Sequence, residues 1–587
     1  MTDNYEFNRS MHKQSDNEYS PYNDKQWNNY INDINGGVYQ SSGLSLVQFD
    51  LSSIYNSGAM TDTNDLFVVI PIIMAAAFST SANNGTLVAP VNGNVNLLSM
   101  KNNFIHLIHQ AGISFNKQNT GEDLQPFINI AKHFQLMSEM SVADLNQVAY
   151  TLGVTKPDNW KSKVYNAQSS GIVTTKSGNG MTNNRPFVAT GGSGGLPINN
   201  TNVPLQYSNC VNDSIGYRLG RYVDTTANQN GFYVSDSYHI ATLNQLNNDY
   251  VPTYQVSNNI MVWTDYAVIR LNTLFDSIGA IGLTSRADIT FRLYINTGIL
   301  NVSVSTPNTT TPGYSLTTTN NGFTNTCPFT VNYLNDLSSN GGIPATTANI
   351  TAGLFISKIP TTTLLGVNLG NAQLPHPMPS CRCYYSQITI QPELKEEYIV
   401  NNRAKKVVYR SVLTNQFNNI SVGGAFNQLI TSGITHPTGV LIVRMVSANS
   451  SNGFQDFAYK SPFDSFPGDG HPLSLTNLQV TIGGKNILQS VLNNNCEVFI
   501  EQIQSCEQLT SADFGVNCGL YDQSWWNNNR YYFVNVERSN ISDKLETRNL
   551  NISFTNNNNN VPIDVLVFTF KSNSGIIDVE TGLFQRE

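Results

Sequence analysis

One stretch of the sequence matches the pattern of a catalytic nucleophile. Residues 191–195 read GGSGG, which fits the G-x-S-x-G pattern of hydrolases. That pattern needs an apolar strand before the serine and a helix after it, because the strained turn between them exposes the hydroxyl. Here Thr190 precedes the stretch and Leu196-Pro197 follows it. The surroundings of Ser193 are therefore typical of a flexible loop and do not predict a nucleophile.

Two other stretches could bind a metal ion or a phosphate. His106 and His109 are spaced so that they could meet one metal ion, but no third ligand lies near them and the HExxH pattern is absent. We expect them to be packed or solvated side chains. Residues 483–486 (GGKN) lack the preceding glycine and the following Ser or Thr of a phosphate loop, so they are expected to form a hairpin turn.

The remaining candidates are pairs of charged, aromatic or sulfur-containing residues. Glu396-Glu397 stands among lysines, as a solvated charged turn does, and Trp525-Trp526 could stack on a sugar but is more typical of core or subunit packing. The seven cysteines contain no CxxC pair, which favours buried free thiols over a zinc site. We therefore predict no catalytic residue, no cofactor or cofactor-binding residue and no metal ligand, and hence no enzyme.

The composition also argues against a lone enzyme. Only 12% of the 587 residues are charged, about half of the roughly 25% that is usual in globular proteins. The polar residues are mostly neutral amides and hydroxyls, which can be buried against another subunit at a lower desolvation cost than charges. The net charge of -8 argues against sequence-specific or broad contact with nucleic acid, which needs Lys and Arg to neutralise phosphates.

Two segments bear on cell targeting and on membranes. Residues 1–35 are polar throughout and contain no signal peptide, so we expect a protein made in a reducing cytoplasm. The longest apolar run, 66–78 (LFVVIPIIMAAAF), is too short to cross a bilayer and contains Pro71. We interpret it as a pair of buried strands and expect no membrane span.

The elements that would carry any site are organised around residues 381–410. The stretch 384–390 alternates as a strand does and stops at Gln391-Pro392, where proline removes a ladder donor. Leu394 and Tyr398 then lie four residues apart on one face of a short helix, and a new strand is expected at 407–409. This pattern predicts that one β unit ends here and another begins.

The two halves of the chain have the same order of elements. In the first half a strand at 113–115 precedes a helix near 130–140, and in the second half a strand at 480–482 precedes a helix near 498–505. We expect these pairs to correspond. The predicted fold is all-β, with two tandem eight-stranded jelly-roll sandwiches, short helices and long loop insertions. The predicted domains are a flexible N-terminal arm at 1–40, a first jelly roll with insertions at 41–398 and a second jelly roll at 399–587.

Two insertions in the first half are expected to lie outside the sandwiches. Residues 165–260 and 300–350 are rich in Gly, Thr and Asn and lack the alternation of a strand. In contrast, residues 287–298 (ADITFRLYINTG) have Ile289, Phe291 and Leu293 on one face and polar residues on the other. That segment predicts a half-buried antiparallel strand.

The order of several motifs resembles that of the major capsid proteins of virophages and polinton-like viruses, which have two jelly rolls per chain. The motifs are ITFRLYINTG, CRCYYSQITIQPELKEEYIV and KKVVYR, followed by LQVTIGGKNI, RYYFVNVERS, PIDVLVFTF and IIDVETG. The resemblance implies a homotrimer that forms a pseudo-hexameric capsomer of an icosahedral shell around double-stranded DNA. It also implies a virion protein, assembled in the host cytoplasm or virus factory, with neighbouring capsomers and penton and minor capsid proteins as partners.

Two other classes of β-sandwich protein stay open at this point. A minor capsid or receptor-binding protein would share the composition and the strand pattern. A carbohydrate-binding or carbohydrate-hydrolysing β-sandwich protein would also be rich in Asn and Thr, but a secretory signal and paired carboxylates facing a cleft would be expected of it.

Overall fold

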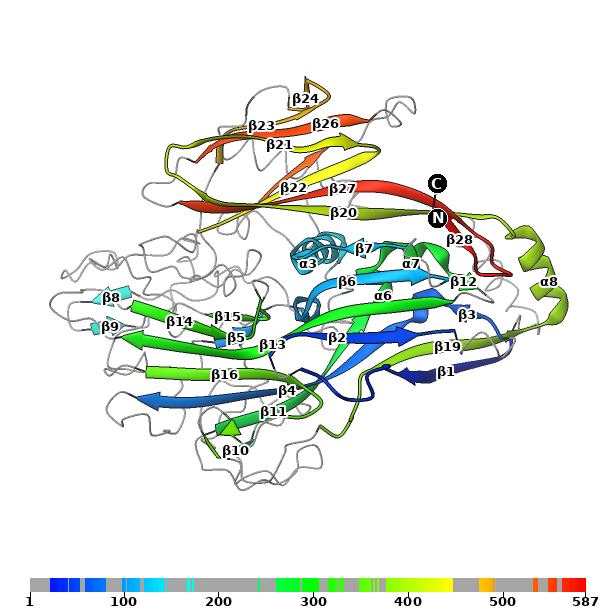
Figure 1. The fold of residues 1–587 in the computed structure, drawn as a ribbon, viewed down its shortest axis with the longest axis horizontal. Helices are drawn as coiled ribbons and strands as arrows, with labels where there is room; N and C mark the ends of the chain where they lie inside the picture. Colours follow the sequence, from blue (N-terminus) through cyan, green and yellow to red (C-terminus); the bar gives the residue numbers. More distant parts are fainter. Residues whose placement is uncertain are drawn as a thin grey trace.

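The chain is described by a computed structural model. It describes residues 22–52, 59–80, 98–144, 260–305, 315–331, 348–359, 376–446, 475–491, 531–536, 547–556 and 562–586, with short gaps inside some ranges, and short strands at 166–168, 171–173, 241–242, 363–364 and 367–368. The strands form two stacked groups joined by a helix at one end (Figure 1). Every pairing between the named strands of the described part is antiparallel.

The second half of the chain forms a complete jelly roll of eight strands. In chain order these are β20 (Lys405–Ile420), β21 (Ala425–Ile434), β22 (Pro437–Val446), β23 (Leu475–Ile482), β24 (Lys485–Asn486), β25 (Tyr531–Asn535), β26 (Arg548–Asn556) and β27 (Ile563–Ile577). One sheet has the order β20-β27-β22-β25 and the other β21-β26-β23-β24. Numbered along the chain, the strands lie in the orders 1-8-3-6 and 2-7-4-5, which is the arrangement of a jelly roll.

The first half repeats this scheme. Strand β13 (Ile289–Ser305) lies between β2 (Gly43–Asp50) and β6 (Ile108–Phe115), as β27 lies between β20 and β22. Strand β4 (Phe67–Thr80) pairs with β11 (Ile260–Arg270), as β21 pairs with β26. Strands β2, β4, β6, β11 and β13 therefore occupy the positions of the first, second, third, penultimate and last strands of the second half. In addition, β16 (Ala348–Ile356) pairs with both β13 and β4 and so joins the two sheets of the first half.

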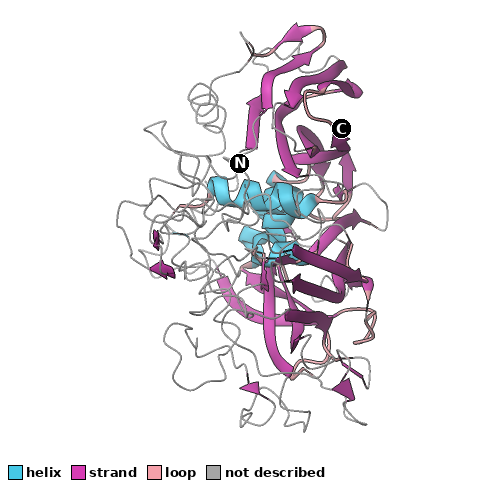
Figure 2. Ribbon diagram, turned by 90° about the vertical axis from the view of Figure 1, so that its left-hand side faces the viewer, coloured by secondary structure: helices cyan, strands magenta, loops and turns pink. Residues whose placement is uncertain are grey.

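The other elements of the first half connect its strands, extend its large sheet or form separate two-stranded sheets. They are η3 (Thr63–Asp65), η5 (Phe104–Leu107), α3 (Ile128–Glu139), α6 (Leu271–Leu274) and α7 (Asp276–Ile281), and the strands β3 (Thr61–Asp62), β5 (Leu98–Met100), β7 (Asp123–Leu124), β8 (Asn166–Gln168), β9 (Gly171–Val173), β10 (Ala241–Thr242), β12 (Leu283–Thr284), β14 (Ser315–Asn321), β15 (Phe329–Val331), β16 (Ala348–Ile356), β17 (Thr363–Leu364) and β18 (Val367–Asn368). Figure 2 shows the helices gathered between the two groups of strands.

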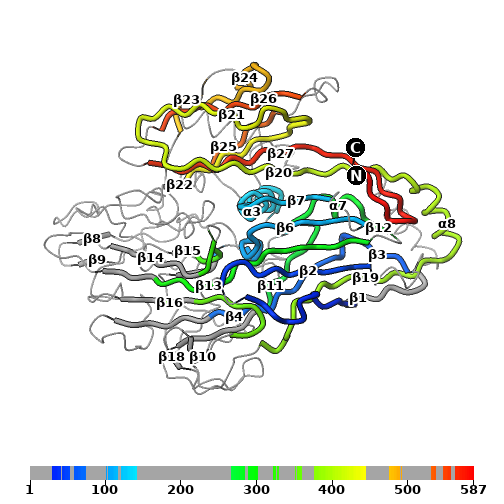
Figure 3. The backbone as a smooth tube through the Cα atoms, in the orientation of Figure 1, coloured from blue at the N-terminus to red at the C-terminus, as the bar shows by residue number. Residues whose placement is uncertain are grey.

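The joint between the halves has the predicted form. Strand β19 (Arg382–Ile390) ends before α8 (Pro392–Asn401), which leads into β20. The proline is at the start of the helix, where its missing N–H leaves no bond unmade. Tyr398 is buried and packs with Leu394, as their spacing predicted. The C-terminal strand β28 (Phe584–Arg586) pairs with β27 and returns close to this joint (Figure 3).

The apolar run at 66–78 is one long strand and not the predicted pair. Strand β4 continues through Pro71 because the proline lies between two different partners on one side: β19 pairs with 67–69 and β16 with 72–80. The carbonyl of Pro71 accepts the N–H of Ser357. The nitrogen of Pro71, which carries no hydrogen, therefore faces the gap between β19 and β16. Among the described residues, no helix is long and apolar enough to cross a membrane.

The prediction of a flexible arm at 1–40 is wrong in part, because residues 22–32 form strand β1 (Tyr22–Asn32). This strand pairs with β19 at the edge of the sheet. Tyr30 packs on Tyr384 with ring centroids 5.6 Å apart, and the guanidinium of Arg382 lies 4.3 Å from the Tyr30 ring. An edge strand pairs through its backbone, so it needs little of the apolar alternation by which strands are recognised.

We expect deletion of residues 1–35 to lower the melting temperature by roughly 5 °C, because the deletion exposes the edge of β19 to solvent. Deletion of residues 1–20, which leaves β1 in place, is the matched control and should leave the melting temperature unchanged. Differential scanning fluorimetry of the two truncated proteins measures the difference. Equal melting temperatures would show that β1 contributes no stability.

Two further expectations about the first half are also wrong. Residues 300–350 were expected outside the sheets, but β13 continues to Ser305 and pairs there with β14 and β16. Threonine-rich chains have a high strand propensity, and backbone pairing does not require an apolar face. The strand at 113–115 belongs to β6, whose counterpart is β22; the expected counterpart, 480–482, lies in β23 of the other sheet. The predicted helix near 498–505 and most of 165–260 lie outside the described residues.

Candidate functional site at the junction of the two sandwiches

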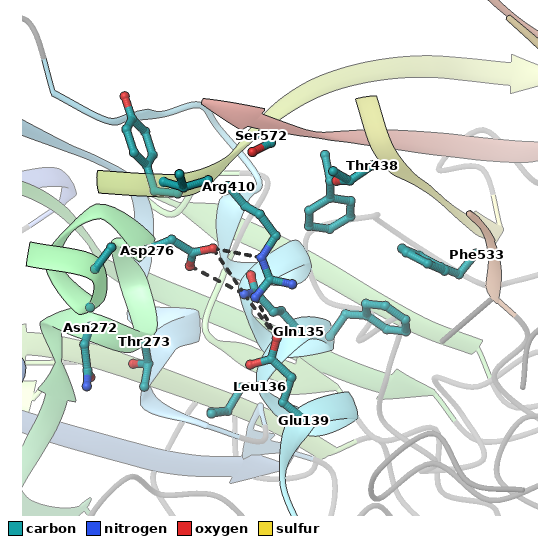
Figure 4. Close-up of a pocket in the computed structure, with 16 residues that line it drawn as sticks. Gln135, Leu136, Glu139, Asn272, Thr273, Asp276, Arg410, Thr438, Phe533 and Ser572 are labelled. Carbon is teal, nitrogen blue, oxygen red and sulfur yellow. Dashed lines mark hydrogen bonds and ion pairs between the residues drawn. The ribbon is translucent and has the colours of Figure 1, made fainter. Parts of the chain in front are cut away.

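A polar site of the described part of the chain lies where the two jelly rolls meet. A cavity of about 760 Å³ opens between helices α3 and α7 of the first half and strands β20, β22, β25 and β27 of the second half (Figure 4). One wall is apolar and aromatic, and the other carries charged side chains. Most of the buried apolar residues of both halves belong to one continuous cluster, so the two sandwiches share a core.

Helix α3 is positioned by the apolar spacing that the sequence showed. Ile130, Phe134 and Met137 recur along the helix and are buried. The ring of Phe134 points out of the first half and meets Tyr531 edge-on at 4.8 Å between centroids. It also stacks with Phe533 at 5.9 Å. Aromatic pairs of this geometry contribute about 0.5–1.5 kcal/mol beyond the area that they bury.

The same helix carries the charged residues of the site. The Nζ of Lys132 lies 2.7 Å from Oδ1 of Asp276 at the start of α7 and 3.9 Å from Oε1 of Glu122 before β7. Arg410 of β20 reaches across the junction. Its Nε donates to Oδ2 of Asp276 at 3.2 Å and its Nη2 to Oε1 of Glu139 at 2.8 Å (Figure 4). We call these five residues the junction cluster.

The junction cluster is largely withdrawn from water. The side chains of Lys132 and Glu122 are fully buried, that of Asp276 is 14% exposed, and those of Arg410 and Glu139 are 31% and 38% exposed. Buried charges are costly unless they are paired, and removal of one partner is more damaging than replacement of the pair. The cluster therefore fixes the relative position of the halves while every charge keeps its partner.

Burial and neighbouring charges change the pKa of these groups in opposite directions. Burial raises the pKa of Glu122 to about 7, and the attraction of Lys132 only partly opposes this rise. Burial alone would also raise the pKa of Asp276, but the charges of Lys132 and Arg410 hold it below its usual range. The carboxylates of Asp276 and Glu139 raise the pKa of Arg410 against the effect of burial, so its cation is retained.

Hydrogen bonds and a ring contact extend the junction on both sides of the cluster. Nδ2 of Asn116 donates to the carbonyl of Gly582 at 3.0 Å, and Phe115 stacks on Phe584 with centroids 4.7 Å apart. Nearer the joint, Nζ of Lys405 donates to the carbonyl of Ile281 at 2.6 Å, and the hydroxyl of Tyr398 donates to that of Leu283 at 2.9 Å. The backbone N–H of Thr414 donates to Oε1 of Gln125 at 2.8 Å.

The junction cluster is better suited to holding the two jelly rolls together than to catalysis. Its most accessible carboxylates, Asp276 and Glu139, accept hydrogen bonds from Arg410 at 3.2 and 2.8 Å. A nucleophile or general base needs a free lone pair directed at a substrate position. We therefore interpret the junction as a structural connection between the two jelly rolls.

The residues considered in the sequence as candidates for chemistry are not brought together. His106 is buried in η5, where Asn129 contacts its Nδ1 at 3.0 Å and the ring of His133 lies 4.8 Å away. His109 in β6 contacts the hydroxyl of Thr324 at 3.2 Å. In the part of the chain that the structure describes, no group of three or more His, Cys, Asp or Glu residues could hold a metal ion.

The other candidates have the plain structural roles expected of them, where they are described. Gly483 and Gly484 form the turn of the β23–β24 hairpin with positive φ angles. Glu396 and Glu397 are exposed on α8. The described cysteines, Cys327, Cys381 and Cys383, are buried and free. The GGSGG stretch at 191–195 and the tryptophan pair at 525–526 lie outside the described residues.

Sequence reasoning missed the junction cluster. Its members come from four separate segments, near positions 122, 132–139, 276 and 410. The one available signal was Lys132, a charged residue inside a short helix whose neighbours Ile130 and Phe134 are apolar. A lysine in that place needs a buried partner, but the sequence does not indicate which distant carboxylate supplies it.

Comparison with known proteins adds similarities of fold. No protein-family model matches the chain, and no curated protein matches it in sequence. Among solved structures, a chain of the Sputnik virophage is similar with a TM-score of 0.41 and 10% identity, over 97% of this chain and 89% of that chain. The Faustovirus major capsid protein has a TM-score of 0.40 and 11% identity, over 95% and 91%.

A third similar structure is that of the PBCV-1 virus capsid, with a TM-score of 0.38 and 8% identity over 97% of this chain and 98% of that chain. The assignment of the fold rests on the strand orders of the two halves. The chain is a double jelly-roll protein, which confirms the fold class predicted from the sequence. The full set of eight strands is seen in the second half, and the first half repeats five of the positions among its described strands.

Proposed function

We propose that this chain is a structural shell protein: the major capsid protein of an icosahedral double-stranded DNA virus, without enzymatic activity. The observation that carries the proposal is the repetition of the jelly-roll strand order within one chain. Three copies that each contribute two similar units can present six similar edges around one axis. Edges of this kind close a flat tile and do not extend into a fibre. The proposed assembly is a homotrimer that acts as a pseudo-hexameric capsomer.

The junction supports this proposal because a tile needs its two units at a fixed spacing. The junction cluster and the shared apolar core join the sandwiches through side chains of both halves. We further propose domains at 41–398 and 399–587, which meet at α8 and are related by a rotation of roughly a sixth of a turn. Residues 1–40 would then comprise an N-terminal segment that is only partly tied down, through β1.

The proposed partners follow from the same assembly. The chain would contact other copies of itself, neighbouring capsomers, and penton and minor capsid proteins in the virion, after assembly in the host cytoplasm or virus factory. Its net charge of -8 does not suit broad contact with phosphates, so no sequence-specific binding of nucleic acid is proposed.

We expect the purified protein to have a native mass of three times 64.7 kDa. Native mass spectrometry, combined with negative-stain images that show a hexagonal outline, tests this expectation. A monomer throughout the micromolar range would contradict the proposal. A fibre-like or five-fold particle would instead support a minor capsid role.

A further inference from the structure

The charges of the junction cluster do not balance when all of its members are ionised. Two cations, Lys132 and Arg410, face three carboxyl groups, those of Glu122, Asp276 and Glu139. The excess negative charge falls on Glu122. Lys132 is 2.7 Å from Asp276 but 3.9 Å from Glu122, and Arg410 is committed to the other two carboxylates.

The surroundings of Glu122 compensate the charge of its carboxylate only in part. Its Oε2 accepts the backbone N–H and the hydroxyl of Ser277, each at 3.1 Å. Its Oε1 is buried and has no hydrogen-bond donor within reach among the described groups. The charged or titratable groups that act on it are Lys132 of α3, Asp276 of α7 and Tyr409 of β20, and Arg410 of β20 is bonded to Asp276. A proton on Glu122 would leave two cations and two carboxylates, which is a balanced set.

We propose that the junction cluster is a pH-sensitive latch between the two jelly rolls, which is closed while Glu122 carries a proton and loosens when that proton is lost. The loosening would separate α3 and α7 from β20, next to the cavity that already lies between them. The latch is a property of one chain, so it holds or fails independently of the proposed capsid function.

The direction of the pH response follows from the two shifted carboxyl groups. The pKa of Glu122 is raised from 4.5 to about 7, so its contribution to the closed state is complete below 4.5 and is lost as the pH rises through about 7. The pKa of Asp276 is held below 3.8, so its contribution is present above 3.8 and is lost as the pH falls through the lower folded value. The junction should be tightest at mildly acidic pH.

Hydrogen exchange of the full-length protein tests the proposal directly. The exchange rates of the amides of α3 and β20, corrected for the intrinsic rate, should rise about tenfold between pH 6 and pH 8.5 in the wild type. The reason is that Glu122 loses its carboxyl proton more easily when the junction is open. In Glu122→Gln the rise should disappear. The exposed Glu397 of α8 provides the matched control, and Glu397→Gln should keep the wild-type response.

A second variant tests the same group without removing it. The hydroxyl of Ser277 donates to Glu122 and favours its ionised form, so Ser277→Ala should move the midpoint of the exchange profile to higher pH. The proposal is overturned by a wild-type profile that does not change with pH, or by a Glu122→Gln variant that keeps the tenfold rise. It is also overturned by an unchanged midpoint in Ser277→Ala, which decides the matter if Glu122→Gln does not fold.

Discussion

Replacement of Lys132 by methionine should cost roughly 3–5 kcal/mol of unfolding free energy at pH 8, as removal of one member of a buried ion pair does. Lys132 is fully buried, and its Nζ is the cation nearest to both Glu122 and Asp276. Methionine fills a similar volume but leaves the buried Glu122 carboxylate with no cation beside it. Urea denaturation followed by intrinsic fluorescence measures the loss.

Two further variants separate the charge effect from a packing effect. The double variant Lys132→Met with Glu122→Gln removes the uncompensated carboxylate, so it should recover roughly half of the lost stability. Lys485→Met changes an exposed lysine in the β23–β24 hairpin and should cost less than about 0.5 kcal/mol. If the double variant is no more stable than Lys132→Met, the buried charge is not the cause.

The parts of the fold that the sequence predicted are those that depend on local pattern. Ile289, Phe291 and Leu293 alternate with polar residues because β13 has one face in the core, and all three are fully buried. The glycines at 483–484 indicated the hairpin because that turn needs positive φ angles. The proline at the start of α8 marked the joint in the same local way.

The parts that the sequence did not predict depend on distant partners. Nothing near β1 shows that β19, some 350 residues away, will accept it as an edge strand. Pro71 seemed to divide an apolar run, but its place between β16 and β19 is decided by strands far along the chain. The junction cluster could not be predicted from the sequence for the same reason. Lys132 and Arg410 reach their shared carboxylate, Asp276, only after both halves have folded.

Truncation of Phe134 to alanine should be as costly as the loss of Lys132, and it should also uncouple the two jelly rolls. Phe134 is fully buried on α3 of the first half, and its ring contacts Tyr531 and Phe533 of the second half. A cavity of about 760 Å³ already lies beside it, so the removed ring enlarges an existing space that cannot readily collapse. Loss of a buried phenylalanine of this kind costs roughly 3–5 kcal/mol.

The control for Phe134→Ala is an aromatic pair that lies inside one jelly roll. Phe426 stacks on Phe554 within the second half, with centroids 4.5 Å apart, so Phe426→Ala should weaken that half without separating it from the first. Differential scanning calorimetry should therefore split the unfolding of Phe134→Ala into two transitions and leave that of Phe426→Ala in the wild-type form. Phe134→Leu, which keeps most of the apolar contact, should lie between Phe134→Ala and the wild type in stability. If Phe134→Ala unfolds in the wild-type form, the junction is held by its charges and hydrogen bonds, and the aromatic wall of the cavity serves only to fill space.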